Sequence, residues 1–199
     1  KDDEIKLGFA ITGVIDPAVA SELERAHPGD VLVLTKPLGT GVLAFARTAE
    51  AHRALSLQFE RHEAQKVYHA ILNGEPKWDE HVARHPLRVN VGHSHRTMVD
   101  DRRGKPSETR FKVLERYTGY SLVESTPATG RTHQIRVHAY ALGHPLVADL
   151  LYSAPPTDLI ARPALHALSL TLTHPESGQR MTFNAPYPED FVQALKSLA

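Results

Sequence analysis

The chain lacks cysteine altogether, which excludes disulfides and thiolate metal sites. It also lacks an excess of charge of either sign, because 23 Lys and Arg residues balance 23 Asp and Glu residues, so no global basic field points to nucleic acid. No apolar run approaches the ~20 residues that a transmembrane helix needs. The start, Lys1 to Glu4, is acidic and unlike a signal peptide. We therefore expect a cytoplasmic protein that does not enter a membrane.

The residues that are present suffice for a folded domain with a sizeable core, since 41% of 199 are hydrophobic. An apolar stripe at helical spacing runs through residues 49–62, and a second helix is predicted near the C-terminus from Glu189. Alternating stretches at 65–72, 109–115 and 120–125 favour strands. We predict an α+β fold, with a mixed, mostly antiparallel sheet and flanking helices.

The most informative stretch runs from Ser125 to Tyr152. A turn follows a strand, then Ile135, His138 and Leu142 recur at helical spacing, and Thr129 or Thr132 is the expected cap. Two arginines lie near this helix start, where backbone N–H groups favour anions. Arg131 can reach outward to a phosphate, while Arg136 can point inward to a buried carboxylate. The alternative is that both are ordinary solvated residues.

The predicted strand at 65–72 carries a second candidate. Alternation places Lys66, Tyr68 and Ala70 on one face and His69 and Ile71 on the other. Tyr68 is either a core tyrosine with a satisfied hydroxyl or a residue that meets a substrate. The turn after the strand is predicted at Asn73-Gly74.

A basic stretch covers residues 84–116 and contains Arg102, Arg103 and Lys105. It is either a solvated loop or an arm that contacts phosphates, since Arg and Lys supply most backbone contacts to nucleic acid. His93-Ser-His95 invites a metal interpretation, but without cysteine or a helical i,i+4 pair we expect no metal there.

Three motifs give these patterns a context. The stretch G-R-T-H-Q-I-R-V-H followed by G-H-P-L-V-A-D-L-L-Y, the earlier K-x-Y-x-A-x-x-x-G, and R-P-A-L-H-A near the C-terminus resemble RluA-type RNA pseudouridine synthases over residues 44–199. The resemblance implies an enzyme that isomerises uridine in structured rRNA or tRNA without cofactor or metal. It implies that Tyr68 and Arg136 belong to the active site. Lys66 and Arg131, with the arm residues Arg102, Arg103 and Lys105, would contact RNA, and we expect a monomer.

The resemblance breaks at the residue that the family needs most, an aspartate in a stretch like H-R-L-D-x-x-T-S-G. Alignment from Gly41 onward places Lys36 at its position, and an ammonium cannot act as a carboxylate nucleophile or base. Asp30 is the nearest upstream carboxylate. The expected alternative is therefore a catalytically dead RNA-binding remnant.

Residues 1–43 are instead similar to an internal stretch of selenophosphate synthetase, which predicts a graft joined at residues 43 and 44. In this segment we expect a helix over 17–26 and a strand over 31–35. The glycine-rich loop at 36–41 is an ordinary turn or a phosphate cradle, but not a Walker A sequence. A weaker alternative function is an ATP-using enzyme of the selenophosphate synthetase kind.

Overall fold

A computed structural model describes residues 31–34, 43–46, 49–91 and 96–199. The helices are α2 (Ala49–Glu60), α3 (Gln134–Ala141), the 3-10 turn η1 (Leu150–Tyr152) and α4 (Glu189–Leu198). The strands are β1 (Val31–Leu34), β2 (Leu43–Ala46), β3 (Gln65–Asn73), β4 (Glu80–Ala83), β5 (Leu87–Val91), β6 (Arg96–Val99), β7 (Thr109–Tyr117), β8 (Tyr120–Pro127), β9 (Leu165–Thr173) and β10 (Arg180–Asn184).

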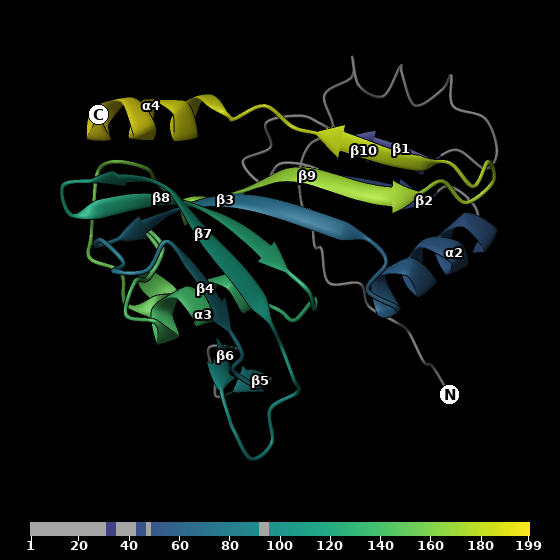
Figure 1. Ribbon diagram of the computed structural model, residues 1–199, viewed down its shortest axis with the longest axis horizontal. Coiled ribbons are helices and arrows are strands. Elements are labelled where there is room, and N and C mark those ends of the chain that lie inside the picture. The colour runs from purple at the N-terminus through teal and green to yellow at the C-terminus, as the bar shows by residue number, and fades with distance from the viewer. Residues whose placement is uncertain (1–30, 35–42, 47–48, 92–95) are drawn as a thin grey trace.

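The main sheet has the order β10-β9-β3-β8-β7-β4, and every neighbouring pair in it is antiparallel (Figure 1). Strand β3 lies in its interior, between β8 and β9. The predicted α+β fold with a mostly antiparallel sheet and flanking helices is confirmed. The predicted strands at 109–115 and 120–125 are β7 and β8, which form a hairpin, and β9 begins at Leu165.

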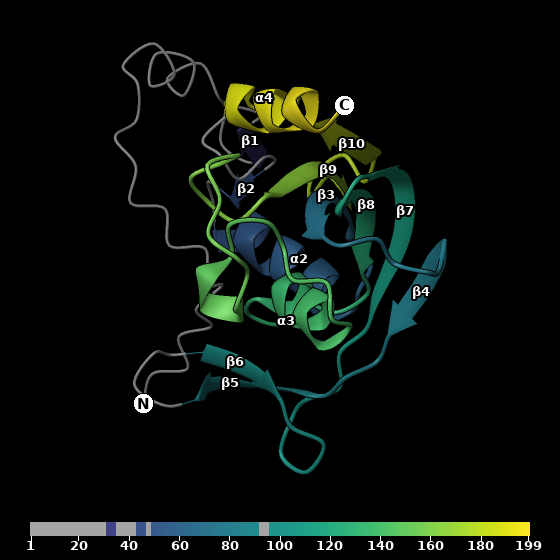
Figure 2. The ribbon, with the colours of Figure 1, turned by 90° about the vertical axis from the view of Figure 1, so that its left-hand side faces the viewer.

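The two faces of β3 pack against different helices, as the alternation predicts. Tyr68, Ala70 and Leu72 contact a core cluster that includes Ile135 of α3. Ile71 points the other way, into a cluster with Phe191 of α4. Figure 2 shows α3 and α4 on opposite sides of the sheet. Each such fully buried aliphatic side chain stabilises the fold by about 1.5–3 kcal/mol.

Helix α2 packs against strand β9 through apolar side chains and through hydrogen bonds from one glutamine. Leu55 packs against Leu170 and Leu172 of β9. Next to it, the buried side chain of Gln58 accepts from the backbone N–H of Thr173 and donates to its carbonyl, both at 2.7 Å. An amide side chain thus satisfies both backbone groups at the end of β9.

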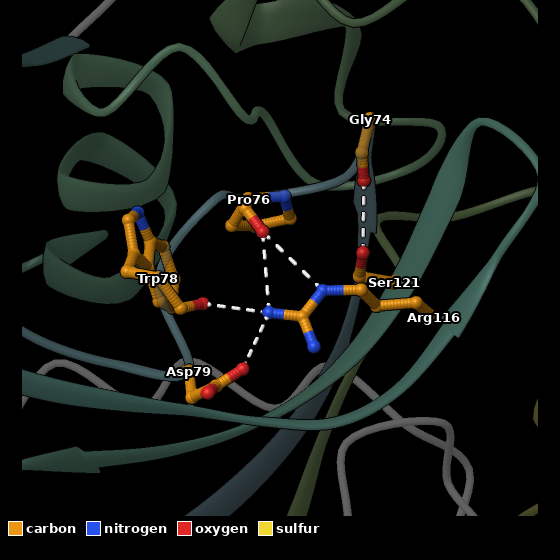
Figure 3. Close-up of polar contacts among 6 residues, drawn as sticks. All are labelled: Gly74, Pro76, Trp78, Asp79, Arg116 and Ser121. Atoms are coloured by element: carbon orange, nitrogen blue, oxygen red, sulfur yellow. Dashed lines mark hydrogen bonds and ion pairs between the residues drawn. The ribbon is translucent and has the colours of Figure 1, made fainter.

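The loop after β3 is tied to the β7–β8 hairpin by Arg116 (Figure 3). The guanidinium donates to the carbonyls of Pro76 and Trp78 and pairs with Asp79 at 2.8 Å. Ser121 donates to the carbonyl of Gly74 in the same place. The chain bends at Gly74, where the turn was predicted, although β3 does not pair with the following strand β4. Gly74 has φ +84°, a conformation that glycine adopts without a steric penalty.

A separate hairpin, β5–β6, lies in the basic stretch, for which the sequence leaves open a solvated loop or an arm that contacts phosphates. Leu87 of β5 is fully buried with Val137 of α3 and Tyr152 of η1. Thr97 of β6 is also buried, and its backbone N–H donates to the Tyr152 hydroxyl at 3.2 Å. The hairpin is therefore fastened to α3 and η1, and this part of the stretch is not a solvated loop.

The predicted strand at 31–35 is β1, which forms an antiparallel pair with β2. The other expectations for the N-terminal segment lie outside the described residues: the helix at 17–26, the glycine-rich loop, Asp30 and Lys36. The His93-Ser-His95 motif lies outside them as well.

Candidate active site

The turn that precedes α3 is built around the side chain of Gln134. Its amide nitrogen donates to the Glu108 carbonyl at 2.8 Å and to the Thr109 hydroxyl at 2.9 Å. Its amide oxygen accepts from the backbone N–H of Arg131 at 3.0 Å and from the Thr129 hydroxyl at 2.6 Å. One buried glutamine thus fixes the turn to strand β7.

The expected cap of α3 by Thr129 or Thr132 is wrong. The cap position is His133, which makes no side-chain cap hydrogen bond and has a left-handed backbone with φ 54°. Thr129 does not serve because Gln134 and the backbone N–H of Glu108 already engage its hydroxyl. The first turn of α3 therefore keeps its backbone N–H groups free of a side-chain cap.

Arg136 points into the protein and forms a buried ion pair with Asp149. Its Nε and Nη2 atoms each lie 2.6 Å from a carboxylate oxygen of Asp149. The Asp149 side chain is 0% exposed, and that of Arg136 is 17% exposed. The guanidinium carbon also lies 5.0 Å from the ring centroid of Tyr152. The expectation that Arg136 meets a buried carboxylate is confirmed, with Asp149 as that carboxylate.

His133 and Tyr152 brace this pair. The Tyr152 hydroxyl accepts from the Thr97 N–H and lies 3.0 Å from His133 Nδ1, to which it can donate when that nitrogen carries no proton. An accepting Nδ1 requires a neutral ring. Burial and the nearby Arg136 charge lower the pKa of His133, which favours the same neutral form.

Tyr68 lies on the α3 side of the sheet, in contact with the cluster that contains Ile135 and Ala139. Burial raises the pKa of its phenol, so the hydroxyl is neutral near pH 7 and can donate or accept. The Tyr68 side chain therefore lies on the face of the sheet against which α3, the helix that carries Arg136, packs. That both side chains line one pocket stays a prediction.

Lys66 lies on the same strand, two residues before Tyr68. Its ammonium donates to the Thr129 carbonyl at 3.2 Å and lies 6.0 Å from the centroid of the Phe59 ring. Burial lowers the pKa of this amine. In the part of the chain that the structure describes, the ammonium has no carboxylate partner and donates to the Thr129 carbonyl alone.

An open groove of about 410 Å³ lies beside the turn. Its lining residues are His62, Arg84, Pro86, Pro106, Ser107, Glu108, Ala128 and Thr129. Lys66 reaches its wall at Thr129, and the Arg131 guanidinium lies 3.4 Å from the Pro106 carbonyl. The structure therefore brings Lys66 and Arg131 to the border of one groove.

The basic stretch divides into engaged and available cations. Arg84, Arg88 and Arg116 pair with Glu108, Asp100 and Asp79 respectively. Arg102, Arg103 and Lys105 are exposed next to the β5–β6 hairpin. The turn that contains Arg102 and Arg103 is held by the Asp100 carboxylate, which accepts from their backbone N–H groups at 3.1 and 2.9 Å. These backbone hydrogen bonds lower the pKa of Asp100.

Two residues of the site had no role in the sequence interpretation, namely Asp149 and Tyr152. Both lie in G-H-P-L-V-A-D-L-L-Y, so the motif contained them, but an aspartate followed by apolar residues does not reveal which cation it meets. The described residues contain no group of three or more His, Asp or Glu side chains placed to hold a metal ion. None of their helices is long and apolar enough to cross a membrane.

Comparisons with known proteins place this arrangement in a family. The family described as RNA pseudouridylate synthase matches residues 38–141. The dual-specificity RNA pseudouridine synthase RluA of Haemophilus influenzae is 40% identical over 148 residues, which are 73% of this chain and 68% of that protein. The chain therefore belongs to the RNA pseudouridylate synthase family.

Other relatives agree. The ribosomal large subunit pseudouridine synthase D of Nitrosomonas europaea is 37% identical over 172 residues, covering 80% of this chain and 48% of the relative. The chain thus spans about half the length of that relative. The structure of human RNA pseudouridylate synthase domain containing 1 matches with a TM-score of 0.65 and 32% sequence identity. The match covers 80% of this chain and 70% of the human chain. These matches give no support to a selenophosphate-synthetase-like segment at residues 1–43.

Proposed function

We propose that this chain is an RNA pseudouridine synthase domain that isomerises uridine in structured rRNA or tRNA. The observation that carries the proposal is the family match over residues 38–141, together with relatives whose names describe ribosomal and dual-specificity pseudouridine synthases. The geometry supports it, because Arg136 is held at the start of α3, on the face of the sheet that Tyr68 occupies.

In this proposal Tyr68 stacks on or hydrogen-bonds the target base, which has to leave its helix to be reached. Lys66 and Arg131 border the groove and meet RNA phosphates. Arg102, Arg103 and Lys105 extend the contact along the exposed turn beside the hairpin. No cofactor is required, since the resemblance implies none.

The catalytic carboxylate is the part of the site that the sequence leaves in question. Asp149 engages Nε and Nη2 of Arg136, and among the described residues Nη1 has no hydrogen-bond partner. A second carboxylate could pair with Nη1, which is the role that the resemblance gives to the family aspartate. Lys36 occupies the aligned position. Two outcomes follow, an active synthase with another carboxylate or a catalytically dead RNA-binding remnant, and the lysine favours the second for this chain as it stands.

We further propose that residues 1–43 are a grafted segment, similar to part of selenophosphate synthetase, whose last residues, 38–43, overlap the start of the family match. We also propose that the protein is a cytoplasmic monomer. The N-terminal proposal rests on the sequence similarity quoted above. An ATP-using activity of that kind is the weaker alternative, because the stretch covers only about a fifth of the chain. Light scattering of the purified chain at several concentrations tests the monomer.

Two assays on the same preparation separate these functions. Tritium release from RNA labelled at carbon 5 of uridine measures isomerisation, and a fluorescence titration with the same RNA measures binding. Release with binding identifies a synthase, and binding without release identifies the remnant. If the chain neither binds the RNA nor releases tritium and instead hydrolyses ATP, the RNA assignment is overturned.

A further inference from the structure

Among the described residues, Arg96 at the start of β6 contacts aromatic rings and no carboxylate. Its guanidinium carbon lies 5.5 Å from the ring centroid of Tyr140 and 5.0 Å from that of Tyr152. The two rings are neighbours, with centroids 6.3 Å apart. Strand β6 and helix α3 therefore meet at one arginine that lies against both tyrosines.

The N–H edges of Arg96 remain available. Among the described residues, no hydrogen bond or ion pair engages its guanidinium. Stacking uses the faces of this planar group and leaves the donors at its edge free to bind phosphate in a bidentate way. The rings also restrict the orientation of the side chain, so less conformational entropy is lost when an anion binds.

Tyr140 adds an exposed aromatic surface to this cation. It is 42% exposed in the last turn of α3, whereas Tyr152 is 1% exposed. Bases stack on exposed aromatic side chains irrespective of sequence, because every base has a π face. An exposed tyrosine beside an unpaired guanidinium is the combination that single-stranded nucleic acid requires, one group for the base and one for the phosphate.

The position of this pair relative to Arg136 indicates which nucleotide it would meet. The guanidinium carbons of Arg96 and Arg136 each lie 5.0 Å from the centroid of the same Tyr152 ring. They are therefore separated by no more than twice that distance. Arg96 therefore adjoins the candidate active site through the ring that Arg136 also contacts.

We propose that Arg96 and Tyr140 form a subsite for an unpaired RNA nucleotide next to the target uridine. Tyr140 stacks on its base and Arg96 binds its phosphate. The subsite rests on the proposed function for its substrate, RNA, but it does not require that the chain be catalytically active. It gives a specific RNA contact to Arg96, which lies within the basic stretch, and to Tyr140, to which the motifs gave no role.

Photo-crosslinking tests the contact directly. A short oligouridine that contains 5-iodouridine is bound to the full chain at low salt and irradiated, and the modified residue is mapped by mass spectrometry. We expect the crosslink at Tyr140. In parallel, Tyr140→Ser should weaken binding by about tenfold and Tyr140→Phe should retain it, since the stacking ring is kept.

The arginine is tested through the salt dependence of binding. Arg96→Gln should reduce the slope of log K against log salt by about 0.7, the value for one single-strand phosphate contact. Arg180→Gln is the control, because Arg180 is exposed on β10, away from α3 (Figure 1), and the substitution removes the same charge together with one hydrogen bond to the Glu63 carbonyl. Thermal melts of all variants show whether a loss of affinity merely reflects unfolding.

The outcomes distinguish this subsite from the broader function. Binding that Tyr140→Ser leaves unchanged, with no crosslink at Tyr140, overturns the subsite even if the chain isomerises uridine. A crosslink at Tyr140 in a chain without isomerisation supports the subsite while the synthase proposal fails. No RNA binding at low salt overturns both.

Discussion

Arg136 and Asp149 form a two-point ion pair in which the carboxylate is 0% exposed and both N–O distances are 2.6 Å. The pair joins the start of α3 to the residue before η1, 13 positions later. It determines the direction of the guanidinium that the family resemblance places in the active site. The structural role of Asp149 is therefore to orient Arg136.

Loss of this carboxylate should destabilise the protein strongly. Asp149→Asn leaves a largely buried guanidinium without its counter-charge, and removal of one partner of a buried pair costs about 3–5 kcal/mol. The free energy of unfolding from urea denaturation measures the effect. The control is Asp79→Asn, whose side chain is 87% exposed in its pair with Arg116 and should change stability by less than about 1 kcal/mol. Equal small losses in both variants would show that the buried pair contributes no more than a surface one.

His138 forms a buried chain of hydrogen bonds beneath the groove. Its Nε2 lies 3.2 Å from the His85 carbonyl and 3.0 Å from the Ser107 hydroxyl, and its Nδ1 lies 2.9 Å from the Thr109 hydroxyl. The carbonyl can only accept, so Nε2 carries the proton and Nδ1 accepts from Thr109. Burial lowers the pKa of His138 to about 4.

Stability should consequently fall on acidification. Between pH 6.5 and about 4 the unfolded chain binds a proton at His138 and the folded chain does not, so unfolding becomes easier as the pH falls. One such histidine contributes up to about 1.4 kcal/mol per pH unit in this window. His138→Gln should therefore flatten the dependence of unfolding free energy on pH between 6.5 and 5.5, whatever its stability at neutral pH. The control substitution is His52→Gln at an exposed position, and identical slopes in all three proteins would contradict the prediction.

RNA binding should be weak and steeply dependent on salt. The available cations are few, because Arg84, Arg88 and Arg116 are occupied by carboxylates. With a small number of phosphate contacts, affinity should fall by about tenfold or more between 50 and 200 mM salt. The combined change Arg102→Gln and Arg103→Gln should reduce the slope of log K against log salt, whereas Arg180→Gln should leave it unchanged. Salt-independent binding would argue against phosphate contacts.

The elements with regular alternation were predictable from the sequence. Strand β3 and the β7–β8 hairpin follow the expected residues, and the faces of β3 are as expected, because side chains of a strand alternate strictly. The β5–β6 hairpin was missed. Its apolar Leu87 and Val99 are interleaved with Arg88 and Asp100, and charge obscured the alternation of two short strands.

The site was predictable only in part, for a similar reason. Motif order indicated Arg136 and Tyr68 as candidate site residues, which stays a prediction, whereas contacts between distant residues depend on packing that no local pattern encodes. The Thr129 hydroxyl is engaged by Gln134, a tertiary partner, in place of the helix cap that its position suggested. In the same way, the stacking of Arg96 on Tyr140 joins residues 44 positions apart that only the docked hairpin brings together.

The most direct test of the account concerns the segment that carries Lys36. Residues 33–41 are replaced by an H-R-L-D-x-x-T-S-G sequence, and tritium release from uridine-labelled bulk ribosomal and transfer RNA is compared with that of the unmodified chain. Lys36→Asp alone should not suffice, since the flanking residues that shape the loop also differ.

We expect no appreciable release from the unmodified chain, because loss of a catalytic carboxylate removes several orders of magnitude in rate, each tenfold being about 1.4 kcal/mol of barrier. We expect measurable release after the replacement, and loss of that release when Arg136→Leu is added. Robust turnover by the unmodified chain would contradict the account and would show that another carboxylate, with Asp30 as the first candidate, performs the reaction.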